Sequence, residues 1–118
     1  MRIGDAEALI DGGEGLRFEY REAGPAGRTW PAFAIRHEGV VHAYLNRCAH
    51  VGIELDWVAG RFFDDAGIYL VCAAHGASYR PADGACVSGP CRGGRLIALA
   101  CRESEGTISV FMGPGAGN

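Results

Sequence analysis

The sequence lacks a long apolar run and a basic run, and both absences narrow the range of functions. No stretch approaches the roughly 18 consecutive apolar residues that would predict a membrane-spanning helix, so we expect no membrane partner. The first residues include Asp5 and Glu7 and precede no apolar run typical of a secretory signal, so we expect a cytoplasmic protein. With 11 basic and 14 acidic residues, the net charge of −3 does not favour nucleic acid as a partner.

A convincing helical repeat with a cap is also missing, which predicts a mainly β protein. Apolar and charged residues alternate over residues 16–21, a pattern typical of a strand with one wet face. Glu38-Gly39 separates two apolar runs, 32–37 and 40–45, and predicts a tight hairpin. Further strands are predicted at 68–71, 78–80, 85–87, 96–102 and 107–111, with short elements at 54–58 and 61–63. About eight to ten short strands in one domain of this length suit small stacked antiparallel sheets.

Two short motifs each combine a cysteine with a histidine. They are Cys48-Ala49-His50 and Cys72-Ala73-Ala74-His75. A structural zinc site usually takes its cysteines as one pair and its histidines as another, whereas here each motif supplies one of each. Two similar loops that approach a cofactor from one side can place two cysteines on an inner iron and two histidines on an outer one. This ligand set suits a [2Fe–2S] cluster.

Strand ends and glycines surround both motifs. The predicted strand at 40–45 runs toward Cys48, and the strand at 68–71 delivers Cys72, so two strand ends form a rigid mount. Gly52 and Gly76 follow the two histidines closely, which allows backbone N–H groups to approach cluster sulfides.

Through these two motifs, the sequence resembles the Rieske [2Fe–2S] ferredoxin family over residues 18–111. Gly89 and Pro90 resemble the proline-containing loop that covers the cluster in this family. The resemblance implies stacked small antiparallel sheets with a cluster-binding subdomain formed by two loops. It places this subdomain at about 46–92 within a domain at 16–112, between a flexible lead at 1–15 and a frayed tail at 113–118. It implies one [2Fe–2S] cluster with the ligands Cys48, His50, Cys72 and His75.

The resemblance also bears on the reduction potential. High-potential Rieske proteins join the two ligand loops by a disulfide, but the matching positions here are Ile53 and Ala74. They also place a Ser and a Tyr hydroxyl where each donates a hydrogen bond to a sulfur, and the matching positions are Ala77 and Tyr79. With the bridge and one donor missing, we expect a potential in the lower half of the Rieske range of about −150 to +300 mV.

Several cysteines and histidines remain outside this ligand set. Cys101 lies in a strand pattern and is expected to be a small buried hydrophobe. Cys86 and Cys91 flank the Gly89-Pro90 loop; without an export signal, reduced thiols are the default, and a disulfide between them stays open. His37 and His42 have no cysteine at ligand spacing and are expected to be solvated or packed strand residues.

The sequence therefore predicts a one-electron carrier that receives electrons from a reductase and passes them to a separately encoded oxygenase or other terminal enzyme. No catalytic residue and no organic substrate are expected. Two alternatives stay open, namely a zinc-stabilised interaction domain without redox activity and a cluster-based redox sensor. Colour distinguishes the zinc domain from the predicted electron carrier, because an iron–sulfur protein is brown whereas a zinc domain is colourless.

Overall fold

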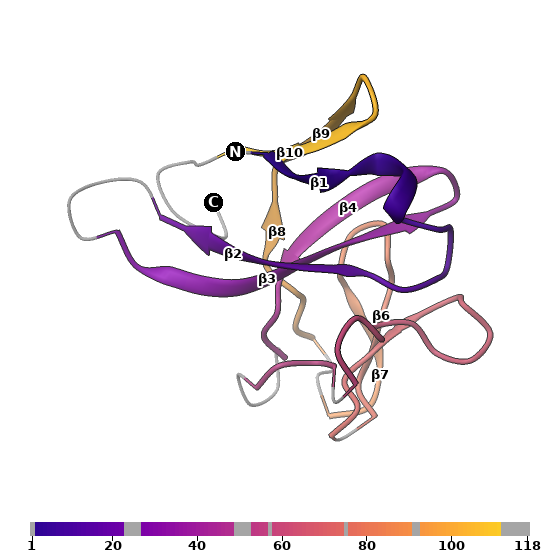
Figure 1. The fold of residues 1–118 in the computed structure, drawn as a ribbon. Coiled ribbons are helices and arrows are strands. Elements are labelled where there is room, and N and C mark those ends of the chain that lie inside the picture. Colours follow the sequence, from indigo (N-terminus) through magenta and orange to yellow (C-terminus); the bar gives the residue numbers. More distant parts are fainter. Residues whose placement is uncertain are drawn as a thin grey trace.

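The computed structural model has three small antiparallel sheets arranged in layers (Figure 1). The structure describes residues 2–22, 27–48, 53–56, 58–74, 76–90 and 93–111. Within these ranges the chain forms ten strands and a single 3-10 helix, which confirms the predicted mainly β class. No helix in this part of the chain is long and apolar enough to cross a membrane.

The middle layer is a four-stranded sheet with the order β2-β3-β4-β8. Alternating side chains of β3 point to opposite faces, as strand geometry requires. Phe33 and Ile35 lie on one face, and Ala32 and Ala34 lie on the other; all four are buried. The sheet therefore separates two hydrophobic cores. The strand bounds are β2 Leu16–Arg21, β3 Thr29–His37, β4 Val40–Leu45 and β8 Ala98–Leu99.

We call the core that contains Ala32 and Ala34 the alanine core. A three-stranded sheet of β1 (Arg2–Asp5), β10 (Thr107–Val110) and β9 (Cys101–Ser104) covers it. The full set of buried members is Ala6, Leu9, Tyr20, Ala32, Ala34, Val41, Ala43, Leu45, Leu99, Ile108 and Val110.

The core on the opposite face contains two cysteines, and we call it the cysteine core. A sheet of very short strands lies over it, β5 (Leu70–Val71), β6 (Ser78–Tyr79) and β7 (Cys86–Ser88). Its buried members are Phe33, Ile35, Tyr44, Cys48, Leu55, Phe62, Leu70, Cys72, Ala77, Tyr79 and Leu96.

The predicted hairpin at Glu38-Gly39 is confirmed, with positive φ angles of 50° and 81° at its two turn residues. The predicted strand at 96–102 is wrong as one element, because the chain changes sheets at Ala100. Leu99 pairs with β4, whereas Cys101 pairs with β10. A continuous apolar pattern cannot show which sheet each half joins, since both halves bury side chains.

Three other parts of the sequence reading differ from the structure. Within the expected flexible lead, Arg2–Asp5 forms β1, which pairs with β10, and the 3-10 helix Ala6–Ala8 follows it. The strand expected at 68–71 covers only Leu70–Val71. The short elements expected at 54–58 and 61–63 form no strand in their described residues; Phe63 makes only an isolated bridge with Leu70. The expected tail at 113–118 lies outside the described residues.

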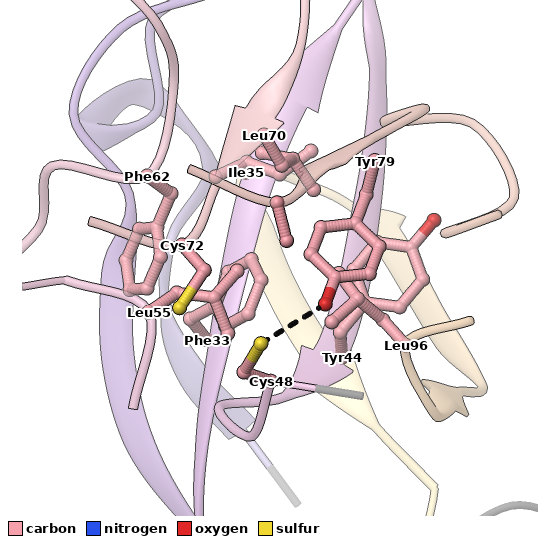
Figure 2. Close-up of a cluster of buried hydrophobic side chains, with 11 residues drawn as sticks. Phe33, Ile35, Tyr44, Cys48, Leu55, Phe62, Leu70, Cys72, Tyr79 and Leu96 are labelled. Carbon is pink, nitrogen blue, oxygen red and sulfur yellow. Dashed lines mark hydrogen bonds between the residues drawn. The ribbon is translucent and has the colours of Figure 1, made fainter. Parts of the chain in front are cut away.

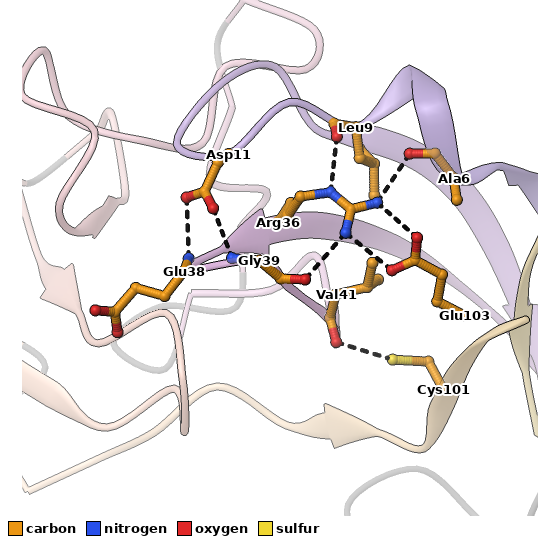
Figure 3. A network of polar contacts seen from close by, with 9 residues as sticks. All are labelled: Ala6, Leu9, Asp11, Arg36, Glu38, Gly39, Val41, Cys101 and Glu103. Atoms are coloured by element: carbon orange, nitrogen blue, oxygen red, sulfur yellow. Dashed lines mark hydrogen bonds and ion pairs between the residues drawn. The ribbon is translucent and has the colours of Figure 1, made fainter. Parts of the chain in front are cut away.

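Arg36 on β3 holds the N-terminal segment, the hairpin and β9 together (Figure 3). Its guanidinium donates to the carbonyls of Leu9 at 2.8 Å, Ala6 at 2.9 Å and Gly39 at 3.1 Å. It also donates to both oxygens of the Glu103 carboxylate, at 2.8 and 3.1 Å. This hydrogen-bonded pair holds the pKa of Glu103 below its usual value.

Candidate iron–sulfur site

The two cysteines of the motifs follow the ends of β4 and β5 and point into the cysteine core (Figure 2). Cys48 is 1% exposed and Cys72 is 0% exposed, and neither forms a disulfide. Figure 2 shows both sulfur atoms beside the ring of Phe33, among other buried side chains. The fold thus brings together two thiols that lie 24 positions apart in the sequence.

Hydrogen bonds close the loop that carries Cys48. Its backbone N–H donates to the carbonyl of Ile53 at 2.7 Å. The buried Asn46 side chain accepts from the Leu55 N–H at 2.8 Å and donates from Nδ2 to the Asp56 carboxylate at 2.8 Å. One amide side chain therefore joins the two limbs of the loop.

Asp56 is a buried charge, since its side chain is 0% exposed. Besides the bond from Asn46, its carboxylate accepts from the Gly60 N–H at 3.0 Å and lies 3.3 Å from Nε of Arg17. Arg17 also forms an ion pair with Glu54. A buried carboxylate is tolerated when it is paired and hydrogen-bonded, so this set of partners explains how the charge can sit behind the loop.

The second loop is tighter. The Cys72 N–H donates to the Ala77 carbonyl at 2.8 Å, and the Gly76 N–H donates back to the Cys72 carbonyl at 2.8 Å. Gly76 has φ +72°, a conformation that favours glycine. A Cβ added at Gly89 would lie 2.9 Å from Cα of Ala77, so the Gly89-Pro90 turn packs directly on this loop.

The two loops are bonded to each other. The N–H of Ala73 donates to the Leu55 carbonyl at 3.0 Å, and the N–H of Leu55 is held by Asn46. Ile53 and Ala74, which the resemblance matches to the bridging positions of high-potential Rieske proteins, flank this contact in the sequence. In this chain a backbone hydrogen bond joins the loops instead.

Tyr79 supplies the polar contact to sulfur that the sequence predicts. Its hydroxyl lies 3.2 Å from Sγ of Cys48 (Figure 2), and the residue is 0% exposed. Either atom could donate between a thiol and a hydroxyl, but a metal-bound thiolate can only accept, so Tyr79 would then be the donor. The neighbouring Tyr44 donates instead to the carbonyl of Pro81 at 2.6 Å, and burial raises the pKa of its hydroxyl.

The structure brings most of the described candidate residues together. Ala77 is fully buried beneath the Gly89-Pro90 turn, and it has no hydroxyl. Three candidates, His50, His75 and Gly52, lie outside the described residues. Within the described ranges, no group of three or more His, Cys, Asp or Glu side chains could hold a metal. The ligand roles of the two histidines therefore stay predictions.

Among the remaining cysteines and histidines in the described ranges, Cys86 packs against the cysteine core. Cys86 is disulfide-bonded, so the default of a reduced thiol is wrong for it; Cys91 lies outside the described residues. Cys101 is half-buried, and its thiol lies 3.5 Å from a β4 carbonyl. His37 lies 3.3 Å from the Glu38 carboxylate. His42 has a lowered pKa because of its burial and, to a lesser extent, the charge of His37.

Sequence reasoning missed Asn46 and Asp56, which fix the loop that carries Cys48, and Leu55, which accepts the bond from the second loop. The place of Asn46 two positions before Cys48 was a usable signal. A polar side chain beside a ligand motif often fixes the loop through bonds to its backbone. Leu55 contributes backbone atoms, which no side-chain pattern can reveal.

Comparison with known proteins assigns the family. Residues 20–108 match the model of the Rieske [2Fe-2S] domain. The chain belongs to this family. The cofactor is therefore one [2Fe–2S] cluster, and the family supports an electron carrier rather than a zinc domain. No curated protein sequence matches the chain.

Solved structures of Rieske ferredoxins share the fold. The ferredoxin of carbazole 1,9a-dioxygenase from Nocardioides aromaticivorans IC177 is 19% identical, with a TM-score of 0.67 over 93% of this chain and 94% of that one. The Sphingomonas yanoikuyae B1 ferredoxin is 23% identical, with a TM-score of 0.69 over 93% and 95%. A complex of reduced oxygenase and oxidized ferredoxin in carbazole 1,9a-dioxygenase contains a chain that is 20% identical, with a TM-score of 0.67 over 93% and 90%.

The described residues of the Rieske domain fit a [2Fe–2S] cluster. Two buried thiols come from two loops that are hydrogen-bonded to each other. A tyrosine hydroxyl reaches one sulfur, and a glycine turn packs where a side chain would collide with the second loop. Thiolates are the ligands that iron–sulfur clusters require, and buried hydrogen-bond donors near sulfur are the usual means of tuning them.

Proposed function

We propose that this Rieske protein carries single electrons from a reductase to a separately encoded oxygenase. The cluster would be held by Cys48 and Cys72 on one iron and by His50 and His75 on the other, within a domain at 16–112. The pair of buried thiols on hydrogen-bonded loops carries the proposal. A cluster of this kind supplies a one-electron couple when it is bound.

The surrounding residues suit an electron carrier. Burial of Cys48 and Cys72 keeps water from the thiolates. The Tyr79 hydroxyl would stabilise the extra negative charge that reduction places on the Cys48 side of the centre. Because Ala77 offers no hydroxyl, only part of the hydrogen bonding of high-potential centres is present, which favours a potential in the lower half of the Rieske range of about −150 to +300 mV.

An oxygenase is the proposed acceptor because of the relatives. Two of the similar structures are named as parts of carbazole 1,9a-dioxygenase, and one is a complex of ferredoxin with its oxygenase. At 19% and 20% identity these likenesses show the fold alone, so the acceptor of this chain is inferred by analogy. A reductase donor follows from the same analogy.

The test of the ligand set is an electron paramagnetic resonance spectrum of the dithionite-reduced protein. Mixed histidine and cysteine ligation gives a lower mean g-value than ligation by cysteine alone. We expect His50→Ala and His75→Ala to abolish this signal, and Cys48→Ser and Cys72→Ser to abolish visible absorption as well.

Two controls come from the rest of the chain. His42→Ala and Cys101→Ser should retain both the signal and the brown colour, since His42 lies within β4 and Cys101 lies on β9, against the alanine core. A mean g-value typical of all-cysteine clusters would contradict histidine ligation. A colourless protein that contains zinc would contradict the proposed function altogether.

A further inference from the structure

A groove of about 660 Å³ lies against the outer side of the loop that carries Cys48. Both limbs of that loop form part of its wall, through Arg47 and Ile53. The beginning of β3 forms another part through Trp30 and Pro31, together with Arg28, which directly precedes the strand. We call this hollow the Trp30 groove.

Two arginines frame the indole ring in this groove. The guanidinium carbon of Arg28 lies 4.5 Å from the ring centroid of Trp30, and that of Arg47 lies 5.7 Å from it. Both distances are within the range of a cation–π contact. The indole N–H donates to the Glu22 carboxylate at 3.0 Å, which fixes the orientation of the ring. The groove therefore presents two positive charges on an oriented aromatic surface.

No carboxylate in the described part of the chain forms an ion pair with Arg28 or Arg47. This part contains every Asp and Glu of the sequence. The acidic residue in the groove wall, Glu54, is paired with Arg17. Both guanidiniums are exposed, so a carboxylate from another molecule could reach them.

The groove has the composition of a protein interface. Arginine and tryptophan are enriched at the centres of interfaces, where a planar guanidinium binds carboxylates in a bidentate manner. Apolar surface adjoins the arginines, because Pro31 is exposed and the Ile53 side chain is 40% exposed. The net charge of the chain is −3, so this groove is a local positive region on an acidic protein.

The groove also lies close to the redox centre. Arg47 directly precedes Cys48, and the carbonyl of Ile53 accepts the hydrogen bond of the Cys48 N–H. A molecule seated in the groove would therefore touch the loop that holds the cluster.

From this placement we propose that the Trp30 groove docks an acidic segment of the electron-transfer partner, with its carboxylates on Arg28 and Arg47. The inference rests on the proposed electron-carrier function and names the surface and the chemistry of the partner. Docking forms no covalent bond. One electron leaves the reduced cluster, and one acceptor is reduced by one electron.

The experiment uses the cluster-containing protein with hexacyanoferrate(III) as an anionic acceptor. The protein is reduced with dithionite, excess reductant is removed, and the rate of cluster oxidation is followed by stopped-flow absorbance. Each molecule of hexacyanoferrate(III) takes one electron and becomes hexacyanoferrate(II). We expect the double variant Arg28→Gln/Arg47→Gln to react about tenfold more slowly at low ionic strength, because charged clefts raise on-rates of opposite charges by at least this factor.

The matched control is Arg102→Gln. Arg102 is another exposed arginine with a cation–π contact, 5.2 Å from the ring centroid of Phe111, and it lies on β9 away from the two loops. Its rate should stay within about twofold of the unmodified rate, and the differences between variants should shrink at high salt. Arg102→Gln removes one positive charge and the double variant removes two. A loss of rate in Arg102→Gln that is half or more of the loss in the double variant, on a logarithmic scale, would show that only net charge matters and would overturn the proposal.

A hexaglutamate peptide tests for an acidic segment rather than a small anion. It should slow the oxidation of the unmodified protein and leave the rate of the double variant unchanged. If acetate at equal ionic strength slowed the reaction as much as the peptide, the groove would bind small anions only, and docking of a segment would be refuted. If the unmodified protein showed no one-electron oxidation at all, the proposed function itself would fail before any variant was compared.

Discussion

The two cores of the molecule are held together in different ways. On the side of the alanine core, the covering strand β10 forms three residue pairs with β1 and four with β9. On the side of the cysteine core, β6 forms two pairs with β5 and two with β7. Side chains replace the missing ladder there, since Asn46 and Asp56 bond to the backbone of the first loop. One half is thus ordered mainly by its backbone, and the other depends on particular side chains.

This difference indicates where the cluster contributes to folding. Cys48 and Cys72 are members of a hydrophobic core, not residues on its surface. Binding of a metal to residues that come together only in the folded chain adds its free energy to folding. We therefore expect the cysteine core to depend on the cluster much more than the alanine core does.

Removal of the cluster should have the largest effect, and it should raise hydrogen exchange much more around the cysteine core than around the alanine core. We expect hydrogen exchange of the Cys72 and Gly76 amides to rise about a hundredfold or more, because local opening there loses the stabilisation by the metal. The amides between β9 and β10, on the alanine-core side, should change by less than about tenfold. Comparison of hydrogen exchange in the holo and apo forms measures both. An equal rise in the two halves would show that they unfold as one unit and would remove the distinction.

Replacement of Asn46 should have the next largest effect. Asn46→Ala leaves the Leu55 N–H without its acceptor and removes a donor from the buried Asp56 carboxylate, so we expect a loss of about 2–4 kcal/mol. The matched control is Asp64→Ala. Its carboxylate also accepts two backbone N–H groups, from Ile68 and Tyr69, but in an exposed turn, which should cost about 1 kcal/mol.

Urea unfolding of the apo forms measures both changes without a contribution from the cluster. If Asn46→Ala and Asp64→Ala lowered the free energy of unfolding by similar amounts, burial of the hydrogen bonds around Asn46 would not increase their contribution to stability. The cluster content of the purified variants then shows whether the network also positions Cys48.

Tyr79→Phe should lower the reduction potential and leave the fold intact. The hydroxyl contact to Cys48 favours the more negative reduced state, so its loss should shift the potential by about −20 to −60 mV, the equivalent of one hydrogen bond. Tyr44→Phe removes a buried hydroxyl that bonds to a carbonyl instead, so it should reduce stability and leave the potential unchanged. If redox titrations gave equal shifts of the reduction potential for both variants, the shift would be due to altered packing and not to the contact with Cys48.

Most strands of the middle sheet could be predicted from the sequence, and fewer of the contacts on either side of it could. The Glu38-Gly39 hairpin was predictable because an alternating pattern and a glycine turn are local signals. The position of Cys48 and Cys72 shortly after two strands was predictable because an apolar run precedes each motif; their ligand roles stay predictions. The bond from Ala73 to Leu55 was not predictable, since it joins backbone atoms of two distant loops. The change of sheets at Ala100 was not predictable either, because it depends on which strand lies beside each half, β4 or β10.

The smallest expected effect concerns His42, on the sheet that the two cores share. Burial, and then the charge of His37, lowers the pKa of His42 below its value in the unfolded chain, near 6.5. The folded state therefore prefers the neutral ring. This contribution to stability is fully present above about pH 6.5 and is lost as the pH falls through 6.5 toward the folded pKa. His42→Gln should make urea unfolding of the apo form less dependent on pH between about 7 and 5. The cluster spectrum of the holo form should not change. If the pH dependence stayed the same, the loss of stability at low pH would arise from other groups. The carboxylates near the first loop would be the first to examine.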